Sequence, residues 1–583
     1  MEQKKLFDKL RMIFPVKERR YFVFLFFLIL IRTLFDFLSV SLVLPLVRLL
    51  LDPAALGQRS WYQLLTRLLG IRDQNTMLLV MIAAIIAVYV IKNLFAIYMT
   101  VVQEVFMARN RMSTSAKCLE CYLRKPYSFH LQHNSSEIIR SIYTDVANAY
   151  NVVSCVISIL ADILISIVLV VYLTMVDLWL TLSIVAGLAL YSVCYFLLVR
   201  NRLKQAGRET RRISVNMVKA LHQAVGGIKE VKVMGTERFF VDAYAADGSA
   251  FVDNKRRYAL FSGVPKYLVE ILCIGCVLGL AAVKIALRQD LSAIVGSLSA
   301  FAVAAIRLMP SANKINDSLN SISYYMPGLN AVCEMIDENW GEDIGRPVQE
   351  PEGRIGDAEP RQADIRVENL SFRYPDSDEP VFENVSFTVK AGSSVGIVGV
   401  TGAGKTTLVD IILGLLEPQQ GRVCYGDADI RADYPRWQSH IGYIPQEIYL
   451  MDESIRANVA LGVQRSRIDD AKVWQALEEA QLADFVRSLK DGLDTVVGER
   501  GVRLSGGQRQ RIGIARALYH DPDILFLDEA TSSLDRATEQ AVIGSVHRMA
   551  GRKTCIIIAH RQSALEHCDA VYRVQDGTLI RER

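Results

Sequence analysis

Six long apolar segments restrict what this chain can fold into more than any other feature. Each has room for the roughly 20 residues of helix that cross a bilayer. They cover residues 21–50, 77–102, 146–175, 178–200, 258–287 and 291–312. We therefore expect a membrane domain of six long helices over 1–335. Residues 336–364 are rich in acid, Gly and Pro, which predicts a linker. We expect 365–583 to form a second domain.

Basic residues ahead of the first apolar segment indicate the orientation of the chain. They are Lys4, Lys5, Lys9, Arg11, Lys17, Arg19 and Arg20. The positive-inside rule places such an N-terminus in the cytoplasm. Six crossings then return the chain to the cytoplasm, which predicts a multi-pass protein of the cell (inner) membrane with a cytoplasmic second domain. The formal net charge of +4 is small for 583 residues and indicates no nucleic-acid partner.

Two long charged stretches, 103–145 and 201–257, fall on the cytoplasmic side. They are too long for turns and too amphipathic for disorder, so we expect helices that project beyond the bilayer. Asn134, three residues ahead of Glu137, predicts a helix start. Gly226-Gly227 predicts a break in the second stretch.

The outer segment 51–76 carries an apolar stripe at helical spacing. Its members are Trp61, Leu64, Leu65, Leu68 and Leu69. The pattern predicts an amphipathic helix that lies at the outer lipid interface or packs against neighbouring spans.

Charged residues inside the predicted spans cost about 2.5–3.5 kcal/mol each at a helix centre, so they usually face a cavity or a partner. They are Arg32, Asp36, Lys92, Lys266, Glu270 and Arg307. One hypothesis is that Lys92, Lys266 and Arg307 line a basic cavity for an anionic cargo group. The alternatives are ion pairs between helices or snorkelling, and Lys266 and Glu270 have the i, i+4 spacing of a neutralising pair.

In the second domain, Gly399-Val-Thr-Gly-Ala-Gly404-Lys405-Thr406 fits the P-loop pattern. An apolar strand, Val395–Val398, precedes it and a helical pattern, Thr407–Leu416, follows. This order is the context in which backbone N–H groups approach phosphates at a helix N-terminus. We expect Lys405 to contact the terminal phosphates of ATP and Thr406 to hold Mg²⁺.

Polar residues that could complete ATP hydrolysis follow other apolar runs. Asp528 and Glu529 end the run that begins at Ile524, and an acid at a strand end beside a P-loop can bind Mg²⁺ through water. Glu529 can position or deprotonate the attacking water. His560 could stabilise charge on the γ-phosphate, and Gln446 could reach metal or water.

Together with Leu504-Ser505-Gly506-Gly507-Gln508, this ordered set resembles an ABC exporter half-transporter. The resemblance implies a helical membrane domain fused to an α/β P-loop ATPase, with catalytic Glu529, His560 and Gln446 and a Mg²⁺ site of Thr406, Gln446 and Asp528. It also implies a loop at Ser533-Leu534-Asp535 and coupling segments at Tyr127–His130 and about 228–240. The implied nucleotide-binding residues are Tyr374, which stacks on adenine, Gly399, Thr401, Gly402, Ala403, Gly404, Lys405, Thr406, Thr407, Ser505, Gly507 and Gln508.

The family mechanism needs two ATPase domains that close head-to-tail, so that Ser505 and Gly507 of one reach the ATP of the other. This chain has one copy of each motif, which favours a homodimer. Closure would open a cavity outward and hydrolysis would reset it.

The cargo is indicated by a finer resemblance to bacterial flippases of lipid-linked oligosaccharides. It lies in Ser41-Leu-Val-Leu-Pro45, Arg307–Asn313 and Tyr443–Tyr449. Such cargo carries a polyprenyl tail, a pyrophosphate and sugars, and would move from the cytoplasmic to the outer leaflet. The alternatives are an exporter of another lipid, a drug or a peptide, and an ATP-gated channel or regulator. The presence of Glu529 and His560 favours repeated turnover over the last of these.

Overall fold

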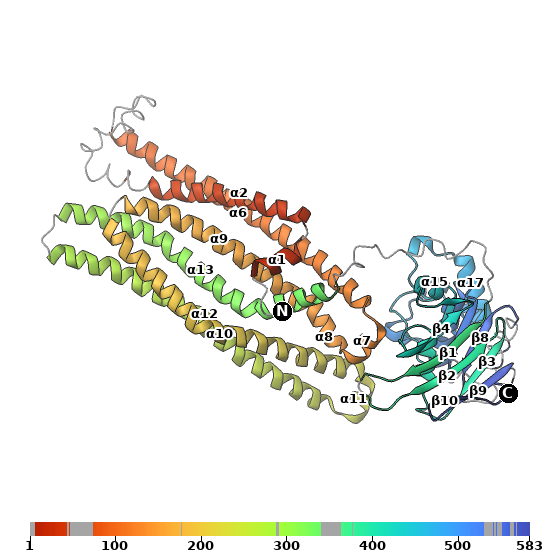
Figure 1. Ribbon diagram of the computed structural model, residues 1–583. Helices are drawn as coiled ribbons and strands as arrows, with labels where there is room; N and C mark the ends of the chain where they lie inside the picture. The colour runs from red at the N-terminus through yellow and green to blue at the C-terminus, as the bar shows by residue number, and fades with distance from the viewer. Residues whose placement is uncertain are drawn as a thin grey trace. The chain divides into compact units, whose positions relative to one another are not determined.

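The computed structural model describes residues 6–14, 16–42, 46, 74–175, 178–286, 291–339, 363–375, 377–529, 540, 544, 551–559, 565–566 and 568–583. The chain forms two compact units (Figure 1). One comprises Met1–Lys125 and Gln132–Gly345, the other Pro126–Leu131 and Arg346–Arg583. The short stretch 126–131 therefore groups with the C-terminal unit, and it contains all of Tyr127–His130, one of the two segments in which the resemblance implies coupling.

The first unit is entirely helical in its described part. Its longer helices are α2 (Val16–Ser41), α6 (Gln74–Leu123), α9 (Val146–Thr174), α10 (Leu178–Gly226), α12 (Glu237–Ala286) and α13 (Leu291–Asn339), preceded by α1 (Leu6–Ile13). Five stretches of the described helices are apolar and long enough to cross a membrane: Arg20–Ser39, Asn75–Leu123, Ser135–Thr174, Ile184–Gly226 and Glu237–Gly279. The expected helical membrane domain is confirmed; the sixth expected span begins α13, where the side chains of 291–307 lie outside the described residues.

Four of these helices are much longer than a bilayer is thick. Helices α6 and α12 contain 50 residues each, and α10 and α13 contain 49. At about 1.5 Å per residue they reach roughly 75 Å, against a hydrocarbon core of about 30 Å. The charged stretches that follow the second and fourth spans thus continue the same helices, as the sequence predicts.

Short helices connect the long ones where the sequence predicts breaks. Helix α8 (Ser135–Arg140) begins after Asn134, whose side-chain oxygen accepts a hydrogen bond from the N–H of Ser136 at 2.9 Å. A π-helical turn, Ser141–Asp145, joins α8 to α9, and α7 (Tyr127–Gln132) precedes α8. Helix α10 ends at Gly226 and α11 (Ile228–Met234) follows, so the predicted starts and breaks are confirmed.

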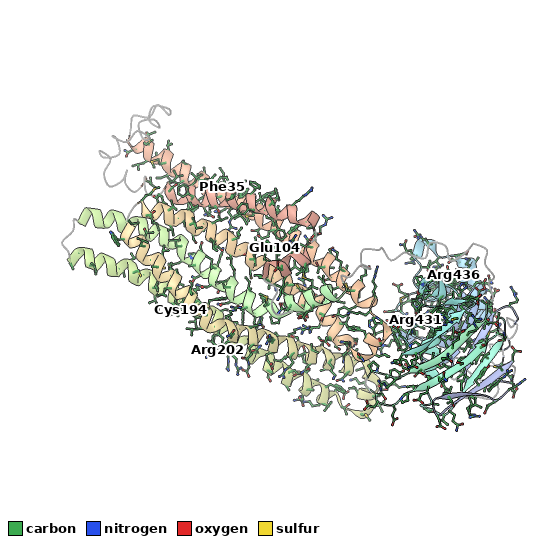
Figure 2. All side chains as sticks on the ribbon, in the orientation of Figure 1. Phe35, Glu104, Cys194, Arg202, Arg431 and Arg436 are labelled. Carbon is green, nitrogen blue, oxygen red and sulfur yellow. The ribbon has the colours of Figure 1, made fainter. Side chains whose placement is uncertain are left out.

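Aromatic side chains contact one another inside the first unit, and many large apolar side chains are exposed on its helices. Phe35 of α2 (Figure 2) contacts Phe95 of α6 with ring centres 5.6 Å apart. Phe14 is buried and contacts Tyr150. By contrast, Leu94 and Ile97 of α6 are 61% and 62% exposed. Large exposed aliphatic side chains on such helices suit contact with lipid tails.

One helix crossing in this unit depends on the absence of a side chain. A Cβ atom on Gly207 of α10 would lie 2.0 Å from the backbone oxygen of Tyr324 in α13. Replacing Gly207 with Ala should therefore push these helices apart and destabilise the protein by about 1–3 kcal/mol or more, as overpacking does. The matched control is Gly248→Ala in α12, whose added Cβ would meet nothing within 4 Å. Melting curves of the purified full-length variants would test this, and equal melting temperatures would contradict it.

The second unit contains two sheets. The antiparallel sheet has the order β2 (Phe382–Val389), β1 (Ile365–Phe372), β4 (Gln420–Tyr425) and β5 (Ala428–Asp429). The larger sheet has the order β10 (Thr578–Arg581), β9 (Ala570–Gln575), β3 (Ser394–Val398), β8 (Thr554–Ile558), β7 (Ile524–Asp528) and β6 (Ile441–Ile444). All its pairs are parallel except β10 with β9. The predicted α/β class is confirmed.

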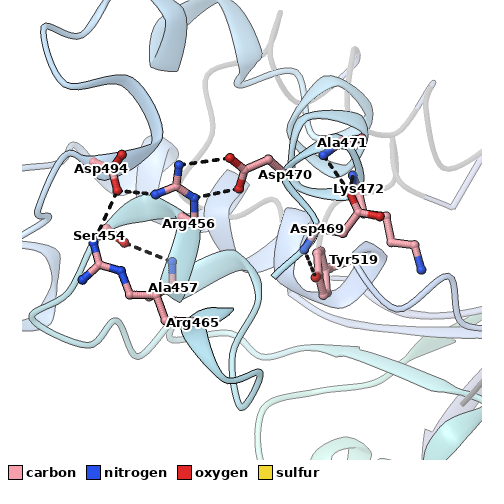
Figure 3. Close-up of polar contacts among 10 residues, drawn as sticks. All are labelled: Ser454, Arg456, Ala457, Arg465, Asp469, Asp470, Ala471, Lys472, Asp494 and Tyr519. Carbon is pink, nitrogen blue, oxygen red and sulfur yellow. Dashed lines mark hydrogen bonds and ion pairs between the residues drawn. The ribbon is translucent and has the colours of Figure 1, made fainter. Parts of the chain in front are cut away.

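The described part of this unit also contains α-helices. They are α14 (Lys405–Ile412), α15 (Tyr434–Ser439), α16 (Ile455–Val459), α17 (Asp470–Glu479), α18 (Ala483–Ser488) and α19 (Gly506–Leu518). Figure 3 shows Arg456 of α16 between Asp470 and Asp494. Its guanidinium donates to Asp470 at 2.7 and 3.1 Å, a paired geometry that fixes α16 against the start of α17.

Candidate nucleotide site

The glycine loop joins the buried strand β3 to helix α14. Gly404 caps α14 with φ of +100°, and Gly402 has φ of +85°. Residues with a side chain rarely adopt these left-handed backbone conformations, so both positions favour glycine. A Cβ on Gly404 would also lie 2.8 Å from Val381. The loop and the helix N-terminus present backbone N–H groups in an arrangement that suits a phosphate.

Lys405 lies inside the loop that precedes it. Its ammonium donates to the backbone oxygens of Gly399 and Val400 at 3.0 and 3.1 Å, and the residue is 7% exposed. The cation is therefore held at the phosphate-binding loop rather than in solvent.

Tyr374 links the end of strand β1 to the same helix. Its hydroxyl lies 3.0 Å from that of Thr407, and its ring contacts Phe372 edge-on. The residue expected to stack on adenine thus lies beside the helix that begins at the glycine loop.

Asp528 is the last residue of β7, every residue of which is buried, and Glu529 follows the strand. Asp528 is 6% exposed, and Glu529 has φ of +47°, an uncommon conformation for a non-glycine residue. The N–H of Glu529 donates to the backbone oxygen of Ile558, and the Gln446 side chain donates to its carboxylate at 2.9 Å. The fold thus brings together two predicted residues that lie 83 positions apart in the chain.

Burial governs the electrostatics around Asp528. It raises the pKa of Asp528; Glu529 raises it further and Lys405 opposes the change. Burial and the nearby Asp528 raise the pKa of Asp410 to about 6. A buried carboxylate with an acidic neighbour is a costly arrangement that a divalent cation would relieve. Oxygen donors such as this carboxylate and the Thr406 hydroxyl are the ligand type that Mg²⁺ prefers.

Two residues near this site were not anticipated from the sequence. Asp410 lies four positions after Thr406, on the same face of α14, and helical spacing is the signal that could have found it. Tyr443 belongs to β6, and burial together with Asp528 raises its pKa. No sequence pattern marks that contact, because β6 and β7 meet only in the sheet.

The signature segment begins helix α19. Ser505 accepts from the N–H of Gln508 at 3.2 Å, while the Gln508 side chain accepts from the N–H of Ser505 at 2.8 Å. This reciprocal capping fixes the turn that carries Gly507. Within the described residues, no hydrogen bond joins Ser505, Gly507 or Gln508 to the glycine loop.

Several predicted positions lie outside the described residues. They are His560, Ser533–Asp535, the apolar stripe of Trp61–Leu69 and the side chain of Arg307. Their roles stay predictions.

One of the three residues predicted to line a basic cavity in the membrane unit forms an ion pair. The Lys92 ammonium lies 2.6 Å from the carboxylate of Asp36, and both side chains are at most 7% exposed. Lys92 therefore follows the alternative of an ion pair between helices, here α6 and α2. Lys266 is exposed on α12, and among the described side chains no ion pair joins it to Glu270.

Comparisons with known proteins agree with this architecture. The chain matches the family of the ABC transporter transmembrane region over residues 22–309 and the ABC transporter family over 382–532. The "ATP-dependent lipid A-core flippase" of Ralstonia nicotianae is 30% identical over 469 residues, which are 80% of this chain and 77% of that protein. The protein of the same name from Aromatoleum aromaticum is 32% identical, over 79% and 74% of the two chains. The structure of a bacterial Atm1-family ABC exporter with ATP bound superposes with a TM-score of 0.77 and 24% identity, covering 96% of this chain and 94% of that one.

Proposed function

Because this chain belongs to the ABC transporters and is an exporter whose ATPase drives transport, we propose that it flips a lipid-linked oligosaccharide. The cargo would pass from the cytoplasmic to the outer leaflet of the cell membrane. The observation that carries this proposal is the similarity, over about four-fifths of the chain, to proteins named ATP-dependent lipid A-core flippase. That name also makes lipid A-core itself the second candidate cargo.

ATP would bind where the glycine loop, Lys405 and Tyr374 meet. The loop N–H groups and the Lys405 ammonium hold the phosphates, and Glu529 positions or deprotonates the attacking water. Gln446, hydrogen-bonded to Glu529, keeps that carboxylate in place. Mg²⁺, when bound by Thr406, Gln446 and Asp528, would neutralise charge that develops on the phosphates.

A second copy of the chain would complete the site. Ser505, Gly507 and Gln508 stand at the start of α19, where a helix N-terminus favours an anion. In one copy they have no hydrogen bond to the glycine loop among the described residues, and so the partner's loop is the site that they can serve. We assign His560 to the same step, with the ATPase unit and the N-terminus in the cytoplasm.

A reconstituted flipping assay tests the cargo. Full-length protein in liposomes would receive fluorescent lipid-linked oligosaccharide in one sample and fluorescent lipid A-core in another. We expect ATP-dependent transfer of the oligosaccharide lipid, and none in liposomes that contain the Glu529→Gln variant. Transfer of lipid A-core alone would favour the second candidate and overturn the first.

A further inference from the structure

The membrane unit contains a pocket that the ATPase mechanism does not use. It has a volume of about 260 Å³ and lies among helices α2, α6, α9 and α13. Two cations and two acids line it: Arg32, Lys314, Asp162 and Asp317. Arg32 and Asp162 belong to segments that are apolar enough to cross the membrane. Ionisable groups at such depth are costly and generally serve a ligand or a pathway.

These four charges line the pocket without closing into ion pairs with one another. Among the described side chains, no ion pair joins Arg32 or Lys314 to Asp162 or Asp317; the ion pair recorded for Arg32 is with Asp36, at 3.9 Å. Asp162 lies within electrostatic range of Lys314 and Arg32. The contrast with Lys92 and Asp36, which close on each other at 2.6 Å, indicates that the pocket keeps its charges apart.

The pocket is large enough for a small polar group. Its volume of about 260 Å³ is many times the roughly 10–15 Å³ that one water molecule needs. This space accommodates a lipid headgroup. Apolar side chains such as Ile29 and Ile165 also line it, which suits the glycerol end of a lipid.

We propose that this pocket binds the headgroup of a zwitterionic phospholipid, with the phosphate against Arg32 and Lys314 and the ammonium against Asp162 and Asp317. A ligand with both charges places an opposite charge beside each half of the pocket, whereas an anionic headgroup places a like charge beside Asp162 and Asp317. Lys266 of α12 also lies within electrostatic range of Asp317. The inference does not depend on which cargo the protein flips, and its test uses no ATP, so the two proposals can fail separately.

Competition between two lipids tests the proposal. Purified full-length protein in detergent is mixed with equal amounts of phosphatidylethanolamine and phosphatidylglycerol that have the same acyl chains, and the bound lipids are counted by native mass spectrometry. We expect about a tenfold preference for phosphatidylethanolamine, the value of one charge-assisted hydrogen bond. Equal binding, or a preference for phosphatidylglycerol, would overturn the proposal.

The two halves of the pocket give different results on substitution. Asp162→Asn and Asp317→Asn should each bring the preference close to one, because they remove the partner of the ammonium. Lys314→Gln should weaken the binding of both lipids alike and leave the preference in place.

Glu270→Gln is the control, because it removes an exposed charge of α12 that does not line the pocket. This variant should show the same lipid preference as the unchanged protein. Asp317 is exposed, so the Asp317→Asn variant should fold even if the Asp162→Asn variant does not. An unchanged lipid preference in Asp317→Asn would refute the assignment.

Discussion

Replacing Glu529 with Gln should lower the rate of ATP hydrolysis by about 10²–10⁴-fold, the usual contribution of a positioned general base. The substitution keeps the shape of the side chain and can keep a hydrogen bond with Gln446, which lies 2.9 Å from the carboxylate. The glycine loop and Lys405 are untouched, so ATP should still bind. Phosphate release measured on purified protein, together with binding of a fluorescent ATP analogue, would show both effects.

A neighbouring acid provides the control for this prediction. Glu447 is exposed and lies next to Gln446. Glu447→Gln therefore removes the same charge near the site and leaves the Glu529 carboxylate unchanged. Its hydrolysis rate should stay within about twofold of the unchanged protein. Normal turnover in Glu529→Gln would remove that residue from the catalytic role.

Replacing Asp145 with Asn should destabilise the membrane unit by about 3–5 kcal/mol, as loss of one member of a buried ion pair does. The Asp145 carboxylate accepts from both terminal nitrogens of Arg140 at 2.7 and 2.5 Å, and both side chains are 1% exposed. Arg211 of α10 approaches the same carboxylate at 3.2 Å. Without that charge, the Arg140 guanidinium remains buried at the π-helical turn with no counter-ion of equal strength. Melting of the full-length protein would report the loss.

An exposed ion pair gives the comparison. Asp242→Asn removes the partner of Arg238, and these side chains are 57% and 85% exposed. Such a pair contributes about 0–1 kcal/mol. The two variants should therefore differ clearly in melting temperature. If they melted together, the Arg140–Asp145 pair would contribute no more than a surface pair.

Local sequence patterns were sufficient for much of the fold. Five of the six predicted spans, the break at Gly226-Gly227, the helix start after Asn134 and the strand–loop–helix around Lys405 all follow from neighbours in the chain, and the structure contains each of them. The charged stretches 103–145 and 201–257 were also expected to be helical. Hydropathy, capping and glycine conformation act over a few residues, so a linear pattern records them.

Local sequence patterns could not predict the contacts between distant parts of the chain. The pairing of Lys92 with Asp36 replaced a predicted cavity role, because no helical spacing relates residues of α6 and α2. The raised pKa of Asp410 depends on the burial that the sheet and α14 create together, and on Asp528 from another strand.

The sequence by itself determined that this chain crosses a membrane and carries an ATPase, because both depend on short-range patterns of apolar and glycine residues. Only the tertiary structure decided which charges neutralise each other and which stay apart. Lys92 closes on Asp36, whereas Arg32, Asp162, Lys314 and Asp317 line a pocket. The physical reason is that Coulomb interaction depends on separation in space and on burial, which packing sets and sequence distance does not.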